Sequence, residues 1–201
     1  MEYAREKILT FLRVLVWYID YLIYLVFNPF KFKPLPKEVK NILIIEMKYI
    51  GDIIISTSAI HAVKNQYKDA EIDIVVPETM NDLLKNNPDI SKIINFEGKS
   101  FSEKLSMIKD KYDLAIIFHN GTFKISLLLF LANIKFRIGC TKVGIMESKG
   151  YFLHRNTKPT FERKHKMDDN LDVIKTIGIK PGEKKLYTYT DKASDKTIVK
   201  I

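Results

Sequence analysis

From residue 41 onward, short apolar runs alternate with longer segments of helical periodicity, and this alternation is the feature that most restricts the fold. The predicted strands are residues 42–46, 71–76, 91–96, 114–118 and 135–138, and the predicted helices are residues 52–67, 78–85, 101–111, 123–132 and 167–177. Strands that alternate with helices indicate a parallel sheet covered on both faces, with right-handed crossovers. The prediction is an α/β fold with one Rossmann-like domain over residues 40–180.

The composition limits the class of protein further. The chain has 201 residues, a net charge of +9 and one cysteine, Cys140, which excludes an internal disulfide and fits a reducing compartment. The basic excess is compatible with nucleic acid, an anionic membrane surface or an anionic substrate. Because the basic residues are spread out and no helix-turn-helix or RNA-binding signature occurs, the sequence favours membrane or phosphate, and no nucleic acid partner is predicted.

Residues 8–27 form an almost continuous apolar stretch, about as long as the roughly 20 residues of a membrane helix. Polar residues recur in and beside it at steps of three and four, which places them on one stripe of a helix: Glu6, Thr10, Arg13, Trp17, Asp20 and Tyr24. Three interpretations are open: a helix in the plane of the membrane surface, a single span whose polar stripe meets a partner, and a helix packed on the protein's own core.

A basic, proline-containing segment follows this stretch. Asn28-Pro29 ends the predicted helix, and after it come Lys31, Lys33, Lys37 and Lys40, interleaved with Pro34 and Pro36. Such a segment beside a membrane helix favours the anionic cytoplasmic leaflet, although a solvated linker has the same composition. Residues 1–39 are therefore predicted to be a membrane-associated helix and linker that hold a cytoplasmic domain on the inner face of the cell membrane.

Several common catalytic signatures are missing from the sequence. There is no G-x-G-x-x-G after the first strand and no P-loop, so neither a dinucleotide-dependent dehydrogenase nor a P-loop enzyme is supported. There is no nucleophile elbow or kinase signature, and the four histidines lack metal-ligand spacing. The prediction is therefore that the protein uses no metal and no cofactor.

The first predicted strand leads into Gly51-Asp52. Gly51 allows a tight turn with a close approach of the backbone, and Asp52 lies at the start of the next helix. Free N–H groups at such a helix start face the carboxyl end of the sheet, where open α/β sheets bind ligands. Asp52 has two interpretations: a helix-capping carboxylate or a general base.

The strand 114–118 leads into the turn 119–122 at the same edge of the sheet. Asn120 and Thr122 offer hydrogen bonds to a sugar hydroxyl, and Lys124 offers a positive charge to an anionic group. A turn followed by a helix cap would use the same residue types, so both interpretations are open for this segment.

Two further candidates lie later in the chain. Arg137 belongs to a short strand, and His165 lies in the basic run 155–166, just before the last predicted helix. Each also has an alternative interpretation without a ligand: a surface arginine, and a solvated histidine that precedes a helix.

Four stretches, in order along the chain, carry a family resemblance: ILIIEMKYIGDIIISTSAIHAVKNQYKDAEIDIVV, NNPDISKIINF, YDLAIIFHNGTFKISLLLFLANIKFRIGC and HKMDDNLDVIKTIGI. They are similar to an opening strand with a Gly-Asp turn and Thr-rich helix, to a third strand, to an Asn-Ser-Phe-Lys-Ser run with a later Arg-x-Gly, and to a His-x-x-Glu helix that ends in Leu-Gly-Ile. Over residues 40–179 the chain thus resembles the acceptor-binding half of glycosyltransferase family 9, the heptosyltransferases of lipopolysaccharide synthesis.

The resemblance implies the N-terminal half of a GT-B enzyme, in which one Rossmann-like domain binds the acceptor and a second binds a nucleotide-sugar. The implied reaction is inverting transfer from an ADP- or UDP-linked sugar to an envelope or lipid-linked glycan, with Asp52 as the base for the acceptor hydroxyl. The implied acceptor-binding residues are Lys48, Gly51, Thr57, Asn120, Lys124, Arg137 and His165.

The sequence departs from the family pattern in three respects. Glu46 stands where many members carry Lys or Arg, and Ile125 interrupts the family's Lys-Ser pair. Residues 181–201 resemble the start of the interdomain linker, and no donor-binding domain follows them. The resemblance therefore implies a truncated or split transferase whose donor half is another chain. The alternative is a non-catalytic, membrane-associated module that binds a glycan or acts as a scaffold.

Overall fold

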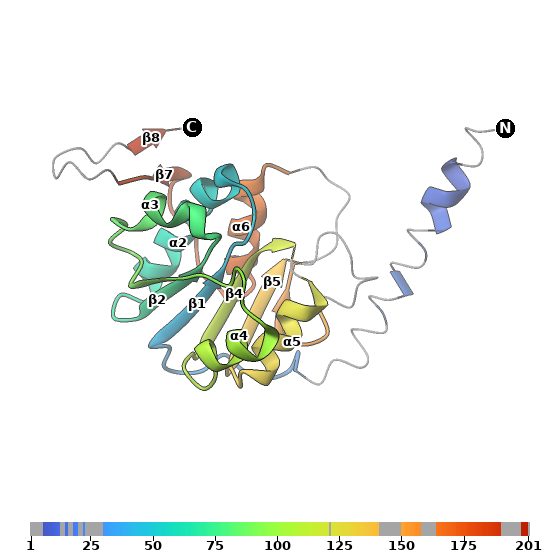
Figure 1. Cartoon of the computed structure of the whole chain (residues 1–201). Coiled ribbons are helices and arrows are strands. Elements are labelled where there is room, and N and C mark those ends of the chain that lie inside the picture. The colour runs from blue at the N-terminus through green and yellow to red at the C-terminus, as the bar shows by residue number, and fades with distance from the viewer. Residues whose placement is uncertain are drawn as a thin grey trace.

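The computed structural model describes residues 6–12, 15, 18–19, 22, 30–120, 122–140, 150–157, 164–189 and 198–200, and it leaves the side chains of residues 119, 120 and 198–200 undescribed. Its centre is a parallel sheet of six strands in the order β3-β2-β1-β4-β5-β6 (Figure 1). The strands are β1 Asn41–Ile45, β2 Glu71–Val75, β3 Lys92–Ile94, β4 Leu114–Asn120, β5 Phe136–Cys140 and β6 Arg155–Asn156. The helices are α2 Ile50–Gln66, η1 Glu78–Met80, α3 Asn81–Leu84, α4 Phe101–Ile108, α5 Phe123–Leu131 and α6 Lys166–Lys175.

Helices cover both faces of the sheet, as predicted. Successive residues of a strand point to opposite faces, and after the half-buried Asn41 the residues of β1 are buried on both. Ile42 and Ile44 pack in one core with α2 and α6, whereas Leu43 and Ile45 pack in a second core with α4 and α5. Figure 1 shows α4 and α5 on one side of the sheet and α2 and α6 on the other. Each such buried side chain contributes about 1.5–3 kcal/mol to folding, so the apolar run of β1 fixes the centre of the domain.

One carboxylate ties together the edge of the sheet at which β1, β4 and β5 begin. Asp113 Oδ2 accepts hydrogen bonds from the backbone N–H groups of Lys40 and Asn41, at 2.9 and 3.0 Å. Its Oδ1 accepts a bond of 2.6 Å from Lys135 Nζ. The contacts set the strand starts in register, which also aligns their far ends, where the predicted site lies.

The connections change direction between β1 and β4. From β1 the chain passes through α2 to β2 on one side, whereas β4 pairs with β1 on the other side and continues to β5. Ligands of open α/β sheets bind outside the carboxyl ends of the strands at such a switch point. The fold therefore places its most favourable ligand position beyond the ends of β1 and β4.

Several predicted boundaries differ from the observed ones. The predicted helix 78–85 is divided into η1 and α3, and the predicted helix 101–111 ends at Ile108. The basic run 155–166 contributes the short strand β6, which pairs with β5 and was not predicted.

The predicted linker 181–201 contributes a short antiparallel pair, β7 (Lys185–Tyr187) and β8 (Ile198–Lys200). Tyr187 packs against α2: its N–H donates to Thr57 Oγ1 at 3.0 Å, and its ring stacks on His61 with centroids 4.0 Å apart. The start of the predicted linker is thus in contact with the domain, and the proposed boundary at residue 180 stays a prediction.

Part of the predicted N-terminal helix falls outside the described residues, namely residues 13–14, 16–17, 20–21 and 23–27. Residues 6–12 are helical, and the large apolar side chains described between residues 8 and 22 are 45% to 66% exposed. These side chains do not pack on the core, which contradicts the third interpretation, a helix packed on the protein's own core. Within the described part of the chain, no helix combines the length and the hydropathy needed to cross a membrane.

Candidate functional site

The candidate site begins at the turn between β1 and α2, beside the switch point. Helix α2 starts at Ile50, two residues earlier than predicted, so Gly51 and Asp52 lie in its first turn. The prediction that Gly51 forms a tight turn is therefore wrong: Gly51 is helical, and a Cβ at this position would meet nothing within 4 Å. The space above the first turn of α2 is open, next to free backbone N–H groups.

Asp52 does not act as a side-chain cap. The N-cap residue of α2 is Tyr49, whose side chain accepts no hydrogen bond from the first N–H groups of the helix. A carboxylate in the first turn is still favoured by the helix dipole, by about 0.3–1 kcal/mol. The side chain of Asp52 is half-buried, and its charge acts on the neighbouring Glu46.

Glu46, the residue directly after β1, is the most unusual group near this edge. Its side chain is fully buried, and among the described residues neither carboxylate oxygen has a hydrogen-bond partner. Burial raises the pKa of Glu46 to about 7; the charges of Lys166 and Lys48 lower this pKa, and that of Asp52 raises it. The sequence placed Glu46 at the end of the first buried strand and marked it as a departure from the family, but did not select it as a site residue.

The start of α6 contributes a second positive charge. Lys166 is half-buried, and its Nζ donates a hydrogen bond of 2.8 Å to the carbonyl oxygen of Phe118 in β4. This bond holds α6 against the end of β4, close enough for Lys166 to act on Glu46. Sequence reasoning did not select Lys166; its place directly after the candidate His165 was the available signal.

His165 is the N-cap residue of α6. Its Nδ1 accepts a hydrogen bond of 3.3 Å from the N–H of Met167, and its side chain is exposed. The structure thus gives His165 a capping role at the carboxyl edge of the sheet. The predicted contact of His165 with an acceptor stays a prediction.

The turn between β4 and α5 lies at the same edge. Thr122 caps α5 by accepting a hydrogen bond of 3.3 Å from the N–H of Ile125, so the capping interpretation holds for this residue. Lys124 follows in the first turn of α5 with an exposed side chain. Asn120 ends β4 with a shift in register against β5. Its side chain and Gly121 lie outside the described residues.

The structure does not bring Arg137 to this edge. Arg137 is the second residue of β5, near the opposite end of the strand, and it is 4% exposed, so it is not the surface arginine of the alternative interpretation. Its Nε donates to the carbonyl of Phe152 at 2.7 Å and its Nη1 to that of Ile134 at 2.6 Å. Burial lowers the pKa of Arg137 to about 10. Through these contacts Arg137 joins the start of β5 to the segment that precedes β6.

Thr57 is also engaged within the protein. It is buried in α2, where its hydroxyl donates to the carbonyl of Ile54 at 2.6 Å and accepts from the N–H of Tyr187. Of the predicted residues, the structure therefore places Lys48, Gly51, Asp52, Asn120, Lys124 and His165 at the carboxyl edge of the sheet, and Arg137 and Thr57 in packing contacts.

Metal binding finds no support in the part of the chain that the structure describes. Within it, no group of three or more His, Cys, Asp or Glu side chains is placed to hold a metal ion. The residues that the structure brings to this edge are a carboxylate, Asp52, and the lysines Lys48 and Lys124, beside the N-terminus of α2.

The sequence and the fold of the chain were compared with those of known proteins. No protein-family model matches the chain. It is 31% identical over 106 residues to lipooligosaccharide heptosyltransferase 2 of Haemophilus ducreyi, a match that covers 49% of this chain and 30% of that protein. It also matches the solved ADP-heptose LPS heptosyltransferase II of Escherichia coli, with 26% identity and a TM-score of 0.50 over 60% of this chain and 35% of that one. The chain is similar to the heptosyltransferases of glycosyltransferase family 9.

A third comparison concerns the fold alone. The glycosyl transferase family 9 structure from Veillonella parvula DSM 2008 has a TM-score of 0.63 and 18% identity, over 78% of this chain and 47% of that one. The predicted resemblance to family 9 is therefore confirmed over part of the chain. The chain spans about a third to a half of the length of these heptosyltransferases and family 9 structures.

Proposed function

We propose that this chain is the acceptor-binding part of a heptosyltransferase-like glycosyltransferase. The observation that carries the proposal is the place of Asp52: a carboxylate without a capping bond, in the first turn of α2, beside the switch point of a sheet that is similar to those of family 9. The relatives' names support a donor in which the sugar is linked to ADP, and an acceptor in the core of a lipooligosaccharide or lipopolysaccharide. A UDP-linked donor is the alternative.

The proposed reaction is a single displacement at the anomeric carbon. Asp52 accepts the proton of an acceptor hydroxyl while that oxygen forms a bond to the anomeric carbon. The bond from this carbon to the diphosphate oxygen breaks on the opposite side, and the nucleoside diphosphate leaves with the electron pair. Inversion follows from this geometry. Proton transfer of this kind contributes about 10² to 10⁴ to the rate.

The remaining residues of the edge bind the acceptor in this proposal. Lys48 and Lys124 supply positive charge for anionic substituents of the glycan, and Asn120 and His165 supply hydrogen bonds to hydroxyl groups. The open space above Gly51 supports a close approach of the glycan to the first turn of α2. The chemistry requires no metal on this chain.

The donor-binding half is proposed to be a second Rossmann-like domain. The proposal rests on the partial coverage of the relatives and on the single six-stranded sheet that the described residues form. In this proposal the second domain binds the nucleotide-sugar and completes the enzyme.

Membrane association is proposed for the N-terminal segment. Its described apolar side chains are exposed, and buried apolar surface together with basic residues is what holds such helices at an anionic bilayer surface. The lysines at positions 31, 33, 37 and 40 follow directly. The proposed location is the inner face of the cell membrane, where lipid-linked acceptors are within reach.

The test of this function is a reconstituted transfer assay. The full chain is mixed with a candidate donor domain, ADP-heptose and a lipopolysaccharide core acceptor, and glycan mass is followed. Asp52→Asn should lower transfer by about 10² to 10⁴ with unchanged thermal unfolding. The matched control is Asp69→Asn, because Asp69 is exposed in the turn after α2. Full activity of Asp52→Asn would contradict the role of Asp52, and glycan binding without transfer by any donor domain would favour the non-catalytic module.

A further inference from the structure

A group of phenylalanines gathers on the surface around α5, and one of them, Phe123, lies at the start of this helix next to the candidate residue Lys124. We call Phe30, Phe123, Phe130 and Phe152 the phenylalanine patch. Their rings contact one another in a chain: the centroids of Phe30 and Phe130 lie 5.5 Å apart, those of Phe130 and Phe152 lie 5.1 Å apart, and those of Phe152 and Phe123 lie 5.6 Å apart. Three separate segments contribute to the patch, so it is a product of the fold.

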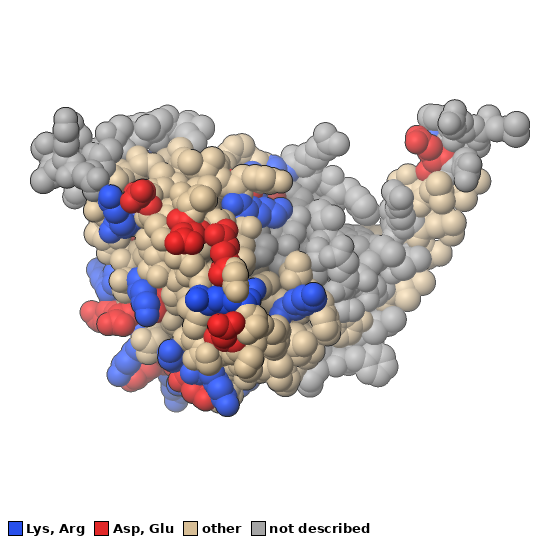
Figure 2. All heavy atoms as spheres, in the orientation of Figure 1, with Lys and Arg blue, Asp and Glu red and all other residues tan. Residues whose placement is uncertain are grey.

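The patch continues into apolar side chains that face water. Phe123 is 41% exposed, Leu131 is 43% exposed, and Phe32, beside the patch, is 80% exposed. Helix α5 is apolar almost throughout, with Leu128 and Leu129 buried against the sheet. In Figure 2 charged side chains gather mostly over the left and centre of the view, whereas the described surface over α5 shows basic but no acidic side chains. Contiguous apolar surface of this kind indicates an interaction site.

Two arginines, Arg137 and Arg155, contact the patch and the segment beside it. The guanidinium of Arg137 lies 5.1 Å from the centre of the Phe30 ring and 5.5 Å from that of Phe130. Arg155 donates hydrogen bonds to the carbonyl oxygens of Lys31 and Lys33, which fixes the segment that carries Phe32. The exposed rings are therefore held in place by contacts below them.

The described segments that build the patch carry charge of a single sign. Residues 30–37, 122–131 and 150–157, which build the patch and its surroundings, contain no Asp or Glu. They contain five basic residues: Lys31, Lys33, Lys37, Lys124 and Arg155. The ammonium group of Lys31 lies 4.7 Å from the centre of the Phe32 ring. Aromatic rings surrounded by lysines match the apolar boundary and the anionic headgroups of a bilayer.

We propose that the phenylalanine patch, with Phe32 and Leu131, rests on an anionic lipid bilayer. The inference deepens the membrane association proposed above and rests on it: the domain itself, and not the N-terminal segment alone, contacts lipid. Residues 30–33 follow that segment in the chain, so its exposed apolar side chains and the patch form consecutive parts of one membrane-binding surface. Such two-part contact would hold the domain in one orientation on the membrane.

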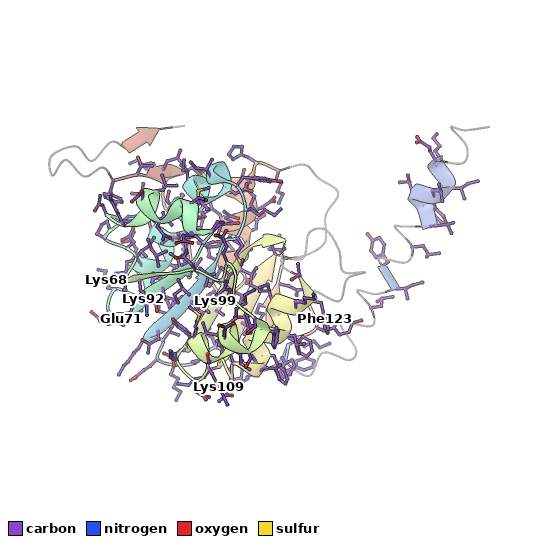
Figure 3. All side chains as sticks on the ribbon, viewed as in Figure 1. Lys68, Glu71, Lys92, Lys99, Lys109 and Phe123 are labelled. Carbon is purple, nitrogen blue, oxygen red and sulfur yellow. The ribbon has the colours of Figure 1, made fainter. Side chains whose placement is uncertain are left out.

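The first experiment measures flotation of the full chain with vesicles of phosphatidylcholine and phosphatidylglycerol. The double variant Phe32→Ser, Phe123→Ser should raise the lipid concentration for half-binding about tenfold or more, because two rings that would enter the bilayer are removed. The double variant Lys31→Glu, Lys33→Glu should do so by a similar factor on these vesicles. The charge control is Lys68→Glu, Lys92→Glu, because Figure 3 shows Lys68 and Lys92 on the opposite side of the domain from Phe123.

The second experiment reads lipid contact directly and does not depend on variants that weaken binding. The chain has one tryptophan, at position 17, so Phe123→Trp in a Trp17→Phe background carries a single reporter on α5. Vesicles should shift its emission to shorter wavelength, and brominated lipid should quench it. Phe101→Trp in the same background is the control, since Phe101 is also 41% exposed and has no ring contact with the patch in the described structure.

The outcomes separate the inference from the wider function. Unchanged flotation of both patch variants, or a Phe123→Trp emission that ignores bound vesicles, would overturn the inference and leave the N-terminal segment as the membrane contact. An emission shift that depends on protein concentration without lipid would overturn it in favour of a second copy of the chain. A loss of sugar transfer in Asp52→Asn with normal flotation would support the catalytic proposal independently.

Discussion

Replacing Glu46 with Gln should change how folding stability depends on pH. Glu46 is fully buried without a hydrogen-bond partner among the described residues, and burial raises its pKa from 4.5 to about 7. Between these values the folded state binds more protons than the unfolded state. The free energy of unfolding of the wild-type protein should therefore fall as the pH rises through this range. The Gln side chain has similar shape and does not titrate, so the variant should lack this loss.

The size of the effect follows from the shift in pKa. Each unit corresponds to about 1.4 kcal/mol, so the full penalty is about 3.4 kcal/mol, of which about 2.5 kcal/mol develops between about pH 5 and pH 8. Relative to wild type, Glu46→Gln should thus gain about 2.5 kcal/mol of stability over this interval. The two N–H donors that the amide buries should lower the free energy of unfolding of the variant by a constant amount. This amount does not depend on pH.

The assay is urea unfolding of both proteins at a series of pH values, with the difference between them plotted against pH. Subtracting the wild type removes the titration of all other groups. Glu71→Gln is the matched control, because Glu71 is an exposed glutamate at the start of the neighbouring strand β2. A flat difference for Glu46→Gln from about pH 5 to pH 8 would refute the reasoning, since it would mean that folding does not favour the protonated carboxyl.

Three further predictions concern the scaffold, each measured by urea unfolding. Gly139→Ala should cost about 1–3 kcal/mol, because the new Cβ would lie 3.0 Å from Leu153 Cδ1, whereas Gly51→Ala should not destabilise; equal effects would contradict this. Asp113→Asn should cost about 1–3 kcal/mol, because the charge that joins two backbone N–H groups and a lysine is lost; an unchanged midpoint would exclude this role. Ser100→Ala should cost about 1 kcal/mol through loss of the capping box of α4; restoration by Ser100→Thr is the control.

The sequence predicted the architecture well because hydrophobic periodicity is a local signal. The runs at residues 42–46 and 114–118 correspond to the central strands β1 and β4, and the parallel sheet with helices on both faces is confirmed. The short strands β6 and β7 were missed, since two or three residues among polar neighbours carry no periodic pattern. They exist because β5 and α2 offer a surface on which they can pair or pack.

For the candidate residues, the sequence predicted the change from strand to helix before Asp52 but not which of the other side chains are used within the protein. The Gly-Asp pair marked the change from strand to helix periodicity, which is visible in the sequence, although both residues lie in the first turn of α2 and not in the turn before it. The roles of Arg137 and Thr57 could not be read in the same way. Both are polar side chains of a kind that binds ligands, and only the contacts with Phe152 and Tyr187 show that their donors and acceptors are used within the protein.

The sequence by itself thus determined which segments form strands and helices, and that a carboxylate follows the first buried strand. Only the tertiary structure decided that β1 and β4 lie side by side, that Glu46 is enclosed near Lys166 and Asp52, and that three distant segments bring four phenylalanines together at α5. The physical reason is the range of the interactions. Periodicity and capping act over a few residues, whereas desolvation of a carboxyl and the exposure of a ring depend on neighbours that the chain supplies from far away.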